Sequence, residues 1–302
     1  MCPIRRHRPF ARPGRLLIAS LLAGTIANGH ADEAHSSEAA WNLPIFDAHV
    51  HYSQPAWEPY PPAAVIEMMD RNGVAMGLVS STPDEGTIRL REYAPRRIVP
   101  ELRAYRSGVG PANWARTPGV ADYLRQRLEQ YSHEGIGEFH VNIVDPVDEP
   151  LLREIAAMAS ERQIPLHVHC GAEPIEWLYR LEPSLSIIWA HAGMTEPPAV
   201  IAKMMQQYPT LYADTSYRED EILPSAGLID PEWRRLLERF ADRFMIGSDT
   251  WVNQQWAVYD ELISVNRQWL GLLPKAVAEK IAYGNAERLF GRKISPDLIG
   301  EK

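Results

Sequence analysis

Cysteine is nearly absent from this sequence. Its 302 residues include only Cys2 and Cys170, and we expect Cys2 to be removed with an N-terminal signal segment, which leaves no partner for an intramolecular disulfide. A chain of this length does not need one, because its apolar core is large. Internal repeats and low-complexity tracts are also missing. With 45% apolar and 23% charged residues, the composition excludes disordered and fibrous proteins.

The N-terminus lacks acidic residues and a long apolar run. Residues 1–15 contain five arginines and no acid, residues 16–26 form a short apolar run, and small residues stand at Gly29 and Ala31. This pattern predicts a secretory signal peptide over residues 1–31. The alternative is an uncleaved membrane anchor, although the run is short for a bilayer. We therefore expect an exported protein, periplasmic or secreted, with a polar linker over residues 32–43.

Basic residues are scarce in the rest of the chain. Once residues 1–31 are removed, 26 basic residues stand against 39 acidic ones, which gives a net charge of −13 with histidine neutral. Such an acidic domain is poorly suited to nucleic acid or to an anionic membrane surface. We therefore expect a small-molecule substrate, no nucleic acid, and no stable membrane association after signal cleavage. The sequence leaves homo-oligomerisation open.

From residue 44 onward, short apolar runs alternate with amphipathic stretches. The predicted strands cover residues 45–51, 74–80, 97–104, 135–141, 165–170, 186–191, 210–214 and 243–248. The predicted helices cover residues 62–71, 120–132, 151–163, 174–181, 198–208 and 231–241, with two closing helices at 252–270 and 274–289. Eight strands alternating with helices over about 250 residues predict an α/β protein, a (β/α)8 TIM barrel with additional C-terminal helices. No flexible linker interrupts this pattern, so we expect one domain over residues 44–302.

Histidine is concentrated where the predicted strands end. Six of the ten histidines lie there, together with carboxylates, and a TIM barrel carries its chemistry at these C-terminal strand ends. Because residues i and i+2 of a strand point to the same face, each strand-end pair projects together into the barrel mouth. The pairs are His49 with His51, Glu138 with His140, and His167 with His169.

Imidazoles and carboxylates gathered in one place predict a metal site. Such groups bind Zn²⁺, Mn²⁺ or Fe²⁺, and we expect Zn²⁺ here, as one or two ions. The expected ligands are His49, His51, Glu138, His169, His191 and Asp249. We expect His140 and His167 in supporting positions behind the ligands. Cys170 is out of phase with His169 and is expected as a buried thiol.

The ordered motifs resemble those of the amidohydrolase superfamily, in its amidohydrolase-related (amidohydrolase 2) branch. Phe-Asp-Ala-His-Val-His at 46–51 resembles the opening H-x-H strand. Residues 165–171, 187–193 and 244–250 resemble the fifth, sixth and eighth strands, and residues 283–290 are similar to the closing helix. The resemblance implies a metal-dependent hydrolase with a metal held by His49, His51 and Asp249, and more ligands on strands four to six.

The fourth strand gives a mixed signal about the number of metals. Gly137-Glu138 resembles the strand-four glutamate of TatD-like and some phosphotriesterase-like members, where it helps to bind or bridge metals. Many members of the amidohydrolase 2 branch lack this carboxylate and hold one metal. The sequence therefore leaves the metal count open between one and two.

The expected reaction is hydrolysis of a C–N, C–O or P–O bond in a small molecule. A bound divalent metal lowers the pKa of its water from about 15.7 toward 7, and Asp249 acts as the general base that passes the proton to the leaving group. His191 either binds a second metal or polarises the substrate's oxygen. The alternatives are a metal-dependent decarboxylase (a lyase) of the same family and a non-catalytic periplasmic metal-binding protein. Glu138 and the intact H-x-H favour hydrolysis.

Three further residues are candidates for contact with the substrate. Arg103, near the end of the third strand, could hold a carboxylate or phosphate, or form a surface salt bridge. Trp57 and Trp251 lie in the loops after the first and eighth strands. They either line a pocket for an apolar ligand or pack these loops onto the barrel rim.

Overall fold

A computed structural model describes residues 43–225 and 227–300 of the chain. The predicted signal peptide at residues 1–31, and the linker up to residue 42, lie outside the described residues. Across the described ranges, no helix combines the length and the apolar character that a membrane crossing requires.

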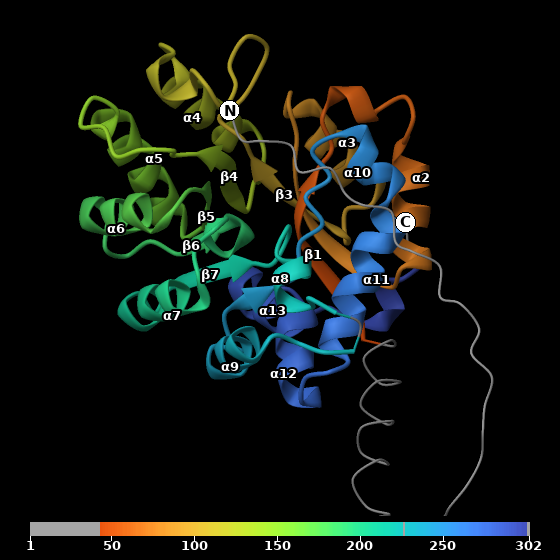
Figure 1. Ribbon diagram of the computed structural model, residues 1–302. Coiled ribbons are helices and arrows are strands. Elements are labelled where there is room, and N and C mark those ends of the chain that lie inside the picture. The colour runs from red at the N-terminus through yellow and green to blue at the C-terminus, as the bar shows by residue number, and fades with distance from the viewer. Residues whose placement is uncertain (1–42, 226, 301–302) are drawn as a thin grey trace, which may run out of the picture.

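Eight parallel strands form one sheet, in the order in which they occur along the chain (Figure 1). They are β1 (Ile45–His51), β2 (Val74–Ser80), β3 (Ile98–Leu102), β4 (Gly135–His140), β5 (Leu166–His169), β6 (Ile187–Trp189), β7 (Leu211–Asp214) and β8 (Phe244–Met245). The sheet closes where the chain after β8 lies against β1, because the Ala48 amide donates to the Ile246 carbonyl at 2.7 Å. The predicted (β/α)8 barrel is therefore confirmed.

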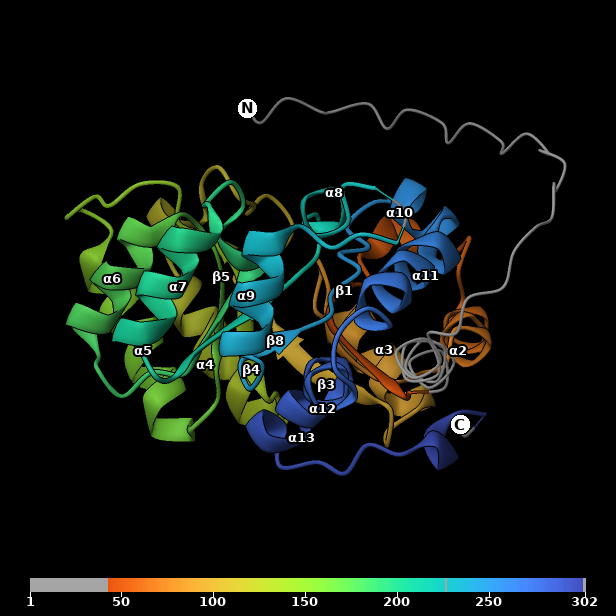
Figure 2. The same ribbon diagram turned by 60° about the horizontal axis from the view of Figure 1, so that its bottom comes forward.

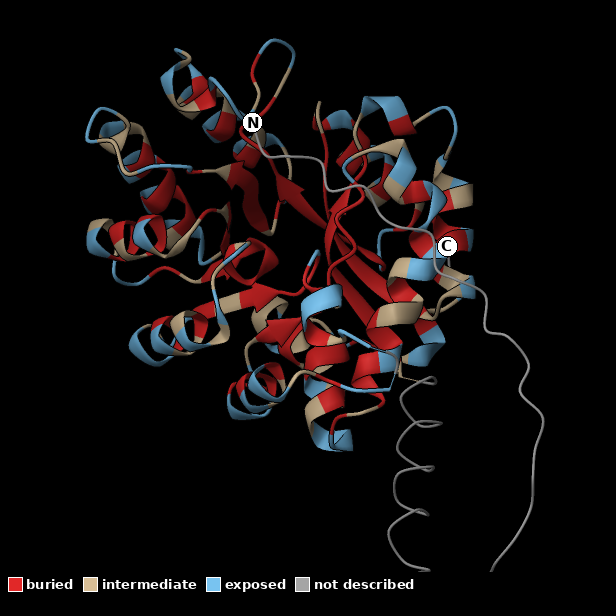
Figure 3. Cartoon of the chain, viewed as in Figure 1, coloured by how far each residue is buried: buried red, intermediate tan, exposed pale blue. Residues whose placement is uncertain are grey.

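The helices lie around this barrel (Figures 1 and 2). They are α2 (Pro62–Arg71), α3 (Glu85–Tyr93), α4 (Val120–Gln130), α5 (Glu149–Arg162), α6 (Ala172–Leu181), α7 (Pro198–Gln207), α8 (Glu219–Ile222), α9 (Pro231–Arg239), α10 (Asn253–Ala257), α11 (Tyr259–Leu270), α12 (Lys275–Glu279) and α13 (Asn285–Phe290). Their inward faces are buried against the strands and their outward faces are exposed (Figure 3). In α2, for example, Val65, Ile66 and Met69 form the buried stripe expected of an amphipathic helix.

The strand predictions hold best where a strand is long. The boundaries of β1 and β2 are as predicted, whereas β6 and β8 are shorter than their apolar runs. The strand predicted over residues 186–191 ends at Trp189, and a tight turn over Ala190–Gly193 follows. Helix α3 was not among the predicted helices. The two closing helices are divided into α10 with α11, and α12 with α13.

The bottom of the barrel is filled by an apolar layer. Val99, Ile188 and Met245 come from β3, β6 and β8, which are not neighbours in the sheet, so these side chains can meet only inside the barrel. Residues that follow α12 pack against the same cluster, and the Phe290 ring stacks on Phe46 with centroids 5.5 Å apart. The C-terminal segment therefore closes the lower end of the barrel.

Polar layers lie above this apolar one, and strand β3 shows the order. Val99 belongs to the apolar cluster, and Glu101, two residues on, faces His167. Two residues further, Arg103 donates to Glu138. Every second residue of a strand faces the barrel interior. Along β3 these residues therefore pass from an apolar layer through a buried ionic layer to the mouth, where the candidate site lies.

Candidate metal centre

Three of the predicted ligands converge from the two strands that close the barrel. The Nε2 atoms of His49 and His51 are 3.1 Å apart. Asp249 Oδ1 lies 3.4 Å from His49 Nε2 and 3.3 Å from His51 Nε2. All three side chains are buried. These three donor atoms surround one point, which we call subsite 1.

Glu138 connects subsite 1 to a second group of ligands. Its Oε2 lies 3.2 Å from His51 Nε2, whereas its Oε1 lies 2.7 Å from His169 Nδ1 and 3.4 Å from His191 Nε2. His169 Nδ1 and His191 Nε2 are 3.2 Å apart. We call the group formed by Glu138 Oε1, His169 and His191 subsite 2. One carboxylate therefore directs one oxygen to each subsite.

Two glycines give the ligands room to approach. A Cβ at Gly137 would overlap the backbone and side chain of His167, so only glycine lets β4 lie this close to β5 beside Glu138. A Cβ at Gly247 would lie 2.8 Å from His49 Cβ. Each glycine stands within two residues of a predicted ligand. Each also lets the backbone next to that ligand lie close to the neighbouring strand, β5 for Gly137 and β1 for Gly247.

His191 and Asp249 have left-handed backbone conformations, with φ angles of 55° and 45°. This conformation costs a non-glycine residue roughly 1–2 kcal/mol. Hydrogen bonds hold it in place: the His191 amide donates to Asp214 Oδ2 at 3.2 Å, and the Asp249 amide donates to the His49 carbonyl at 2.7 Å. Buried Arg218 also donates to the His191 carbonyl at 3.3 Å. Non-glycine residues held in such conformations are concentrated at functional sites.

The Nδ1 atoms of His49, His51 and His191 lie beside oxygens that the sequence analysis did not single out. His49 Nδ1 lies 3.3 Å from Asp214 Oδ2, and His51 Nδ1 lies 2.8 Å from Ser80 Oγ. His191 Nδ1 lies 2.8 Å from Ser216 Oγ. When Nδ1 donates to these oxygens, Nε2 keeps its lone pair for the subsites, which is the usual arrangement behind a metal-binding histidine.

The electrostatics of the centre are dominated by burial and by the crowded carboxylates. Burial alone would lower the pKa of His49, but the carboxylates of Asp249, Asp214 and Glu138 raise it well above its usual value. Burial would raise the pKa of Glu138, but the charge of His49 and hydrogen bonds from the surrounding histidines hold it well below its usual range. Burial raises the pKa of Asp249. Glu138 thus stays negatively charged between the imidazoles, whereas the Asp249 carboxyl takes up a proton more readily than an ordinary aspartate.

These residues fit a divalent cation. Asp249 Oδ1 is buried without a hydrogen-bond partner among the described residues, although it lies within 3.4 Å of two imidazole nitrogens. An orphaned buried carboxylate oxygen is costly unless something binds it. The donor set of imidazole nitrogens and carboxylate oxygens is the one that Zn²⁺, Mn²⁺ and Fe²⁺ prefer. Subsite 1 and subsite 2 could each hold one ion, with Glu138 between them.

Arg103 is buried beside the centre. Its Nε donates to the Glu138 carbonyl at 3.1 Å and its Nη2 to Glu138 Oε2 at 3.3 Å, while its guanidinium stacks on the Tyr105 ring. The surface salt bridge considered from the sequence is therefore wrong, because the pair is buried. Arg103 orients the carboxylate that connects the subsites, and its binding of a substrate stays a prediction.

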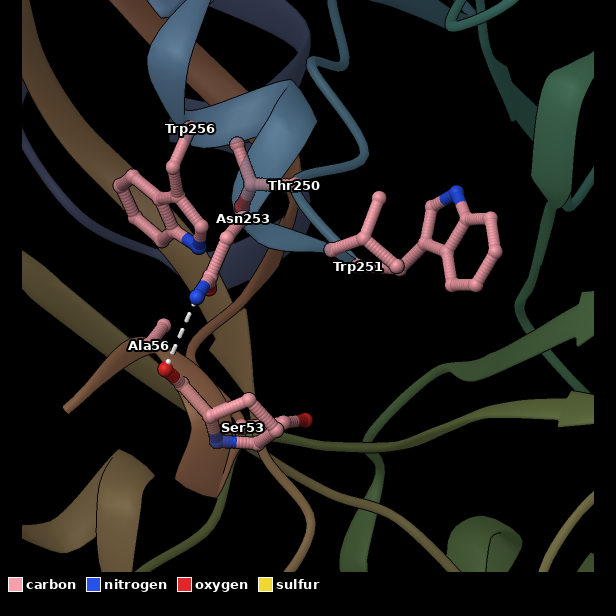
Figure 4. A pocket seen from close by; sticks show the side chains of 8 residues that line it. Ser53, Ala56, Thr250, Trp251, Asn253 and Trp256 are labelled. Atoms are coloured by element: carbon pink, nitrogen blue, oxygen red, sulfur yellow. Dashed lines mark hydrogen bonds between the residues drawn. The ribbon is translucent and has the colours of Figure 1, made fainter. Parts of the chain in front are cut away.

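The two predicted tryptophans lie in different surroundings. The Trp57 indole donates to the Tyr52 carbonyl and is covered by Arg89, so it packs the loop after β1. Trp251 is 54% exposed. It lines a cavity of about 10 Å³ with Ser53 and Trp256, yet its indole points away from the other labelled side chains (Figure 4).

Tyr217 is a residue of the mouth that the sequence analysis missed. Its hydroxyl accepts a hydrogen bond from Trp251 Nε1 at 2.8 Å, and its ring lies 5.5 Å from that of His191. Trp251 and Tyr217 are both more than 40% exposed. They form an aromatic rim next to subsite 2.

A TIM barrel whose C-terminal mouth gathers imidazoles and carboxylates has the architecture of a metal-dependent hydrolase. The family model described as "Amidohydrolase" matches residues 46–292 and makes the class more specific: the chain belongs to the amidohydrolase family. No curated protein matches the chain.

Solved structures share this fold at low sequence identity. The lactonase Lmo2620 from Listeria monocytogenes is 14% identical with a TM-score of 0.59, over 84% of this chain and 96% of that chain. The TatD homologue YJJV from Escherichia coli K12 is 16% identical with a TM-score of 0.60, over 83% and 99%. The organophosphorus hydrolase from Deinococcus radiodurans is 15% identical with a TM-score of 0.56, over 83% and 94%.

Proposed function

We propose that the protein hydrolyses a C–N, C–O or P–O bond of a small molecule at a centre of two divalent ions. The observation that carries this proposal is the position of Glu138, which directs one oxygen to each of two ligand groups. A centre for one ion would need only His49, His51 and Asp249. The placement of Glu138 between the subsites therefore favours two ions over one.

We propose Zn²⁺ in both subsites. Subsite 1 would be formed by His49, His51, Asp249 and Glu138 Oε2, and subsite 2 by Glu138 Oε1, His169 and His191. A divalent cation at such a site supplies a water acidic enough to attack at neutral pH and a positive charge for the oxygen of the substrate. The protein's own contribution is to fix the ligands, through Asp214, Ser80 and Ser216 behind the histidines.

Asp249 is the proposed general base. Burial raises the pKa of its carboxyl and so brings this pKa closer to the working pH. A general base is most effective when its pKa lies near the working pH. Its Oδ2 lies 3.9 Å from His191 Nε2, so the carboxylate reaches from subsite 1 toward subsite 2. It would take the proton of the attacking water and give it to the leaving group.

The rim formed by Trp251 and Tyr217 is the proposed wall for the substrate. Both rings are exposed and lie next to His191. Large rings at a barrel mouth bind the apolar part of a ligand. Lactones and phosphoesters are the first substrates to test, because structures of similar fold include a lactonase and an organophosphorus hydrolase.

The experiment is to measure turnover and metal content together. The metal-loaded protein is tested against a panel of lactones, amides and phosphoesters, alongside Asp249→Asn, which keeps the shape of the side chain. We expect the substitution to reduce turnover at least ~10²-fold, within the range for a lost general base, while most of the metal is kept. Trp57→Phe is the control, since Trp57 packs a loop away from the centre.

Two outcomes would contradict the proposal. Near-normal turnover of Asp249→Asn would exclude its role as the base. Release of CO₂ from a carboxylated substrate, with no bond hydrolysed across the panel, would identify a decarboxylase instead.

A further inference from the structure

His140 lies beside subsite 2, and the proposed function does not use it. It is the last residue of β4 and pairs in register with His169 on β5, so the two side chains leave the sheet on the same face. Their rings stack with centroids 4.0 Å apart and an interplanar angle of 18°. His140 therefore stands directly next to a proposed ligand.

Tyr105 fixes which nitrogen of His140 carries the proton. The backbone amide of His140 donates to the Tyr105 hydroxyl at 2.8 Å, and His140 Nδ1 lies 2.8 Å from the same oxygen. Nδ1 is the one acceptor within reach of the buried Tyr105 hydroxyl among the described residues, so we assign the hydrogen of the hydroxyl to Nδ1. A neutral His140 that accepts at Nδ1 carries its hydrogen on Nε2.

The contact that sets this tautomer is itself rigid. Tyr105 is buried, and the Arg103 guanidinium lies over its ring at 4.6 Å. Trp114 Nε1 donates to the His140 carbonyl at 2.9 Å and holds the strand end. His140 therefore has little freedom to turn its ring or to exchange its tautomer.

The Nε2 atom of His140 has no hydrogen-bond partner within residues 43–225 and 227–300, and the side chain is only half-buried. A donor held in a fixed direction, beside the proposed ligand His169 and on a side chain that is partly exposed, is suited to an oxygen that gains negative charge during a reaction. Neutral imidazole is known to serve as such a donor in enzymes.

We propose that His140 is a catalytic residue that donates from Nε2 to the oxygen of the substrate on which negative charge develops, and that Tyr105 is a positioning residue that keeps the proton on Nε2. This proposal rests on the proposed function, because it needs a substrate at the subsites. The donor would act on a carbonyl or phosphoryl oxygen, so it fits an ester, amide or phosphoester equally.

The first test reads the tautomer and needs no substrate. The zinc-loaded protein is labelled with ¹⁵N-histidine, and two-bond ¹H–¹⁵N correlation spectra distinguish the two neutral forms. We expect His140 in the Nε2–H form in the wild type, and a mixture with the Nδ1–H form in Tyr105→Phe. A predominant Nδ1–H form in the wild type would overturn the proposal.

The second test compares two replacements of similar size. His140→Gln places an amide N–H near the position of Nε2, whereas His140→Met has no donor. We expect both to keep the full metal content by elemental analysis. His140→Met should bind inorganic phosphate about tenfold more weakly by calorimetry, and kcat should fall roughly 10²–10³-fold with KM little changed. His140→Gln should recover most of both losses.

The outcomes separate this proposal from the proposed function. If no panel substrate is turned over, the proposed function fails, while the tautomer and phosphate binding still test His140. Loss of metal in His140→Met would overturn the proposal and make His140 a ligand, because one of its nitrogens lies within 4.8 Å of ligand atoms of Glu138 and His169. Unchanged kcat and phosphate affinity in His140→Met, with metal retained, would overturn it as well.

Discussion

His167 ties the stability of the barrel to pH. It is fully buried below the centre, with Nδ1 3.3 Å from Glu101 Oε2 and Nε2 3.2 Å from Asp214 Oδ2. Burial alone would lower the pKa of His167, but the charge of Glu101 and the hydrogen bonds to both carboxylates raise it from the usual 6.5 to about 9. The folded protein therefore holds a proton on His167 that the unfolded chain releases near neutral pH.

The sign and size of the effect follow from this difference. A group with a raised folded-state pKa stabilises fully below its unfolded pKa, and this contribution is lost as the pH rises through the folded value. The window is pH 6.5 to 9, and a shift of roughly 2.5 units corresponds to about 3 kcal/mol in the free energy of unfolding. Such a loss is a large part of the stability of an ordinary domain.

Urea unfolding of the metal-free protein between pH 6 and pH 9.5 measures this term, by comparison with His167→Gln. The wild type should lose stability across the window, and the variant should lose less by about 3 kcal/mol. The difference in pH dependence between the two proteins isolates His167, because the other titrating groups are present in both. One such group is Glu219, because burial raises the pKa of Glu219 to about 8. Equal pH dependence of the two proteins would refute the assignment of a charged His167.

Two further predictions concern metal binding at the centre and the close packing of β4 against β5. Neighbouring carboxylates raise the pKa of His49 well above 6.5, so metal binding at neutral pH must displace a proton from this imidazole. The metal affinity should therefore rise with pH, and calorimetry in buffers of different ionisation enthalpy should detect the released proton. Metal binding without proton release would contradict this prediction. Gly137→Ala should lower the free energy of unfolding by about 1–3 kcal/mol in urea, because its Cβ would overlap His167. Gly284→Ala is the matched control, since its Cβ meets only ordinary contacts, and an equal loss in both would refute the packing argument.

The strands of the barrel were predictable because their residues obey simple rules. Strands β1 and β2 are long and buried on both faces, as expected of a parallel sheet. β6 was predicted too long, because an apolar run does not reveal that the backbone turns into the left-handed region at His191. β8 was also predicted too long, since only Phe244 and Met245 of its run form a strand. Helix α3 was missed because its sequence is largely polar, with Leu90 as its one large buried side chain.

The gathering of the six predicted ligands was also predictable, since each stands at or just after the C-terminal end of a strand. What surrounds them was not. A single buried aspartate such as Asp214 has no signature in the sequence, yet it binds His49, His167 and the His191 amide at once. Arg103 was placed near the mouth but not on Glu138, because that contact depends on how β3 and β4 stagger in the closed barrel.

The number of bound ions is the sharpest test of a centre with two metal subsites. Elemental analysis of the zinc-loaded wild type should give two equivalents, and Glu138→Gln should give one, because subsite 1 keeps His49, His51 and Asp249 while subsite 2 loses its carboxylate. His169→Asn should likewise give one. One equivalent in the wild type, unchanged in Glu138→Gln, would contradict the claim that this carboxylate joins two metal subsites.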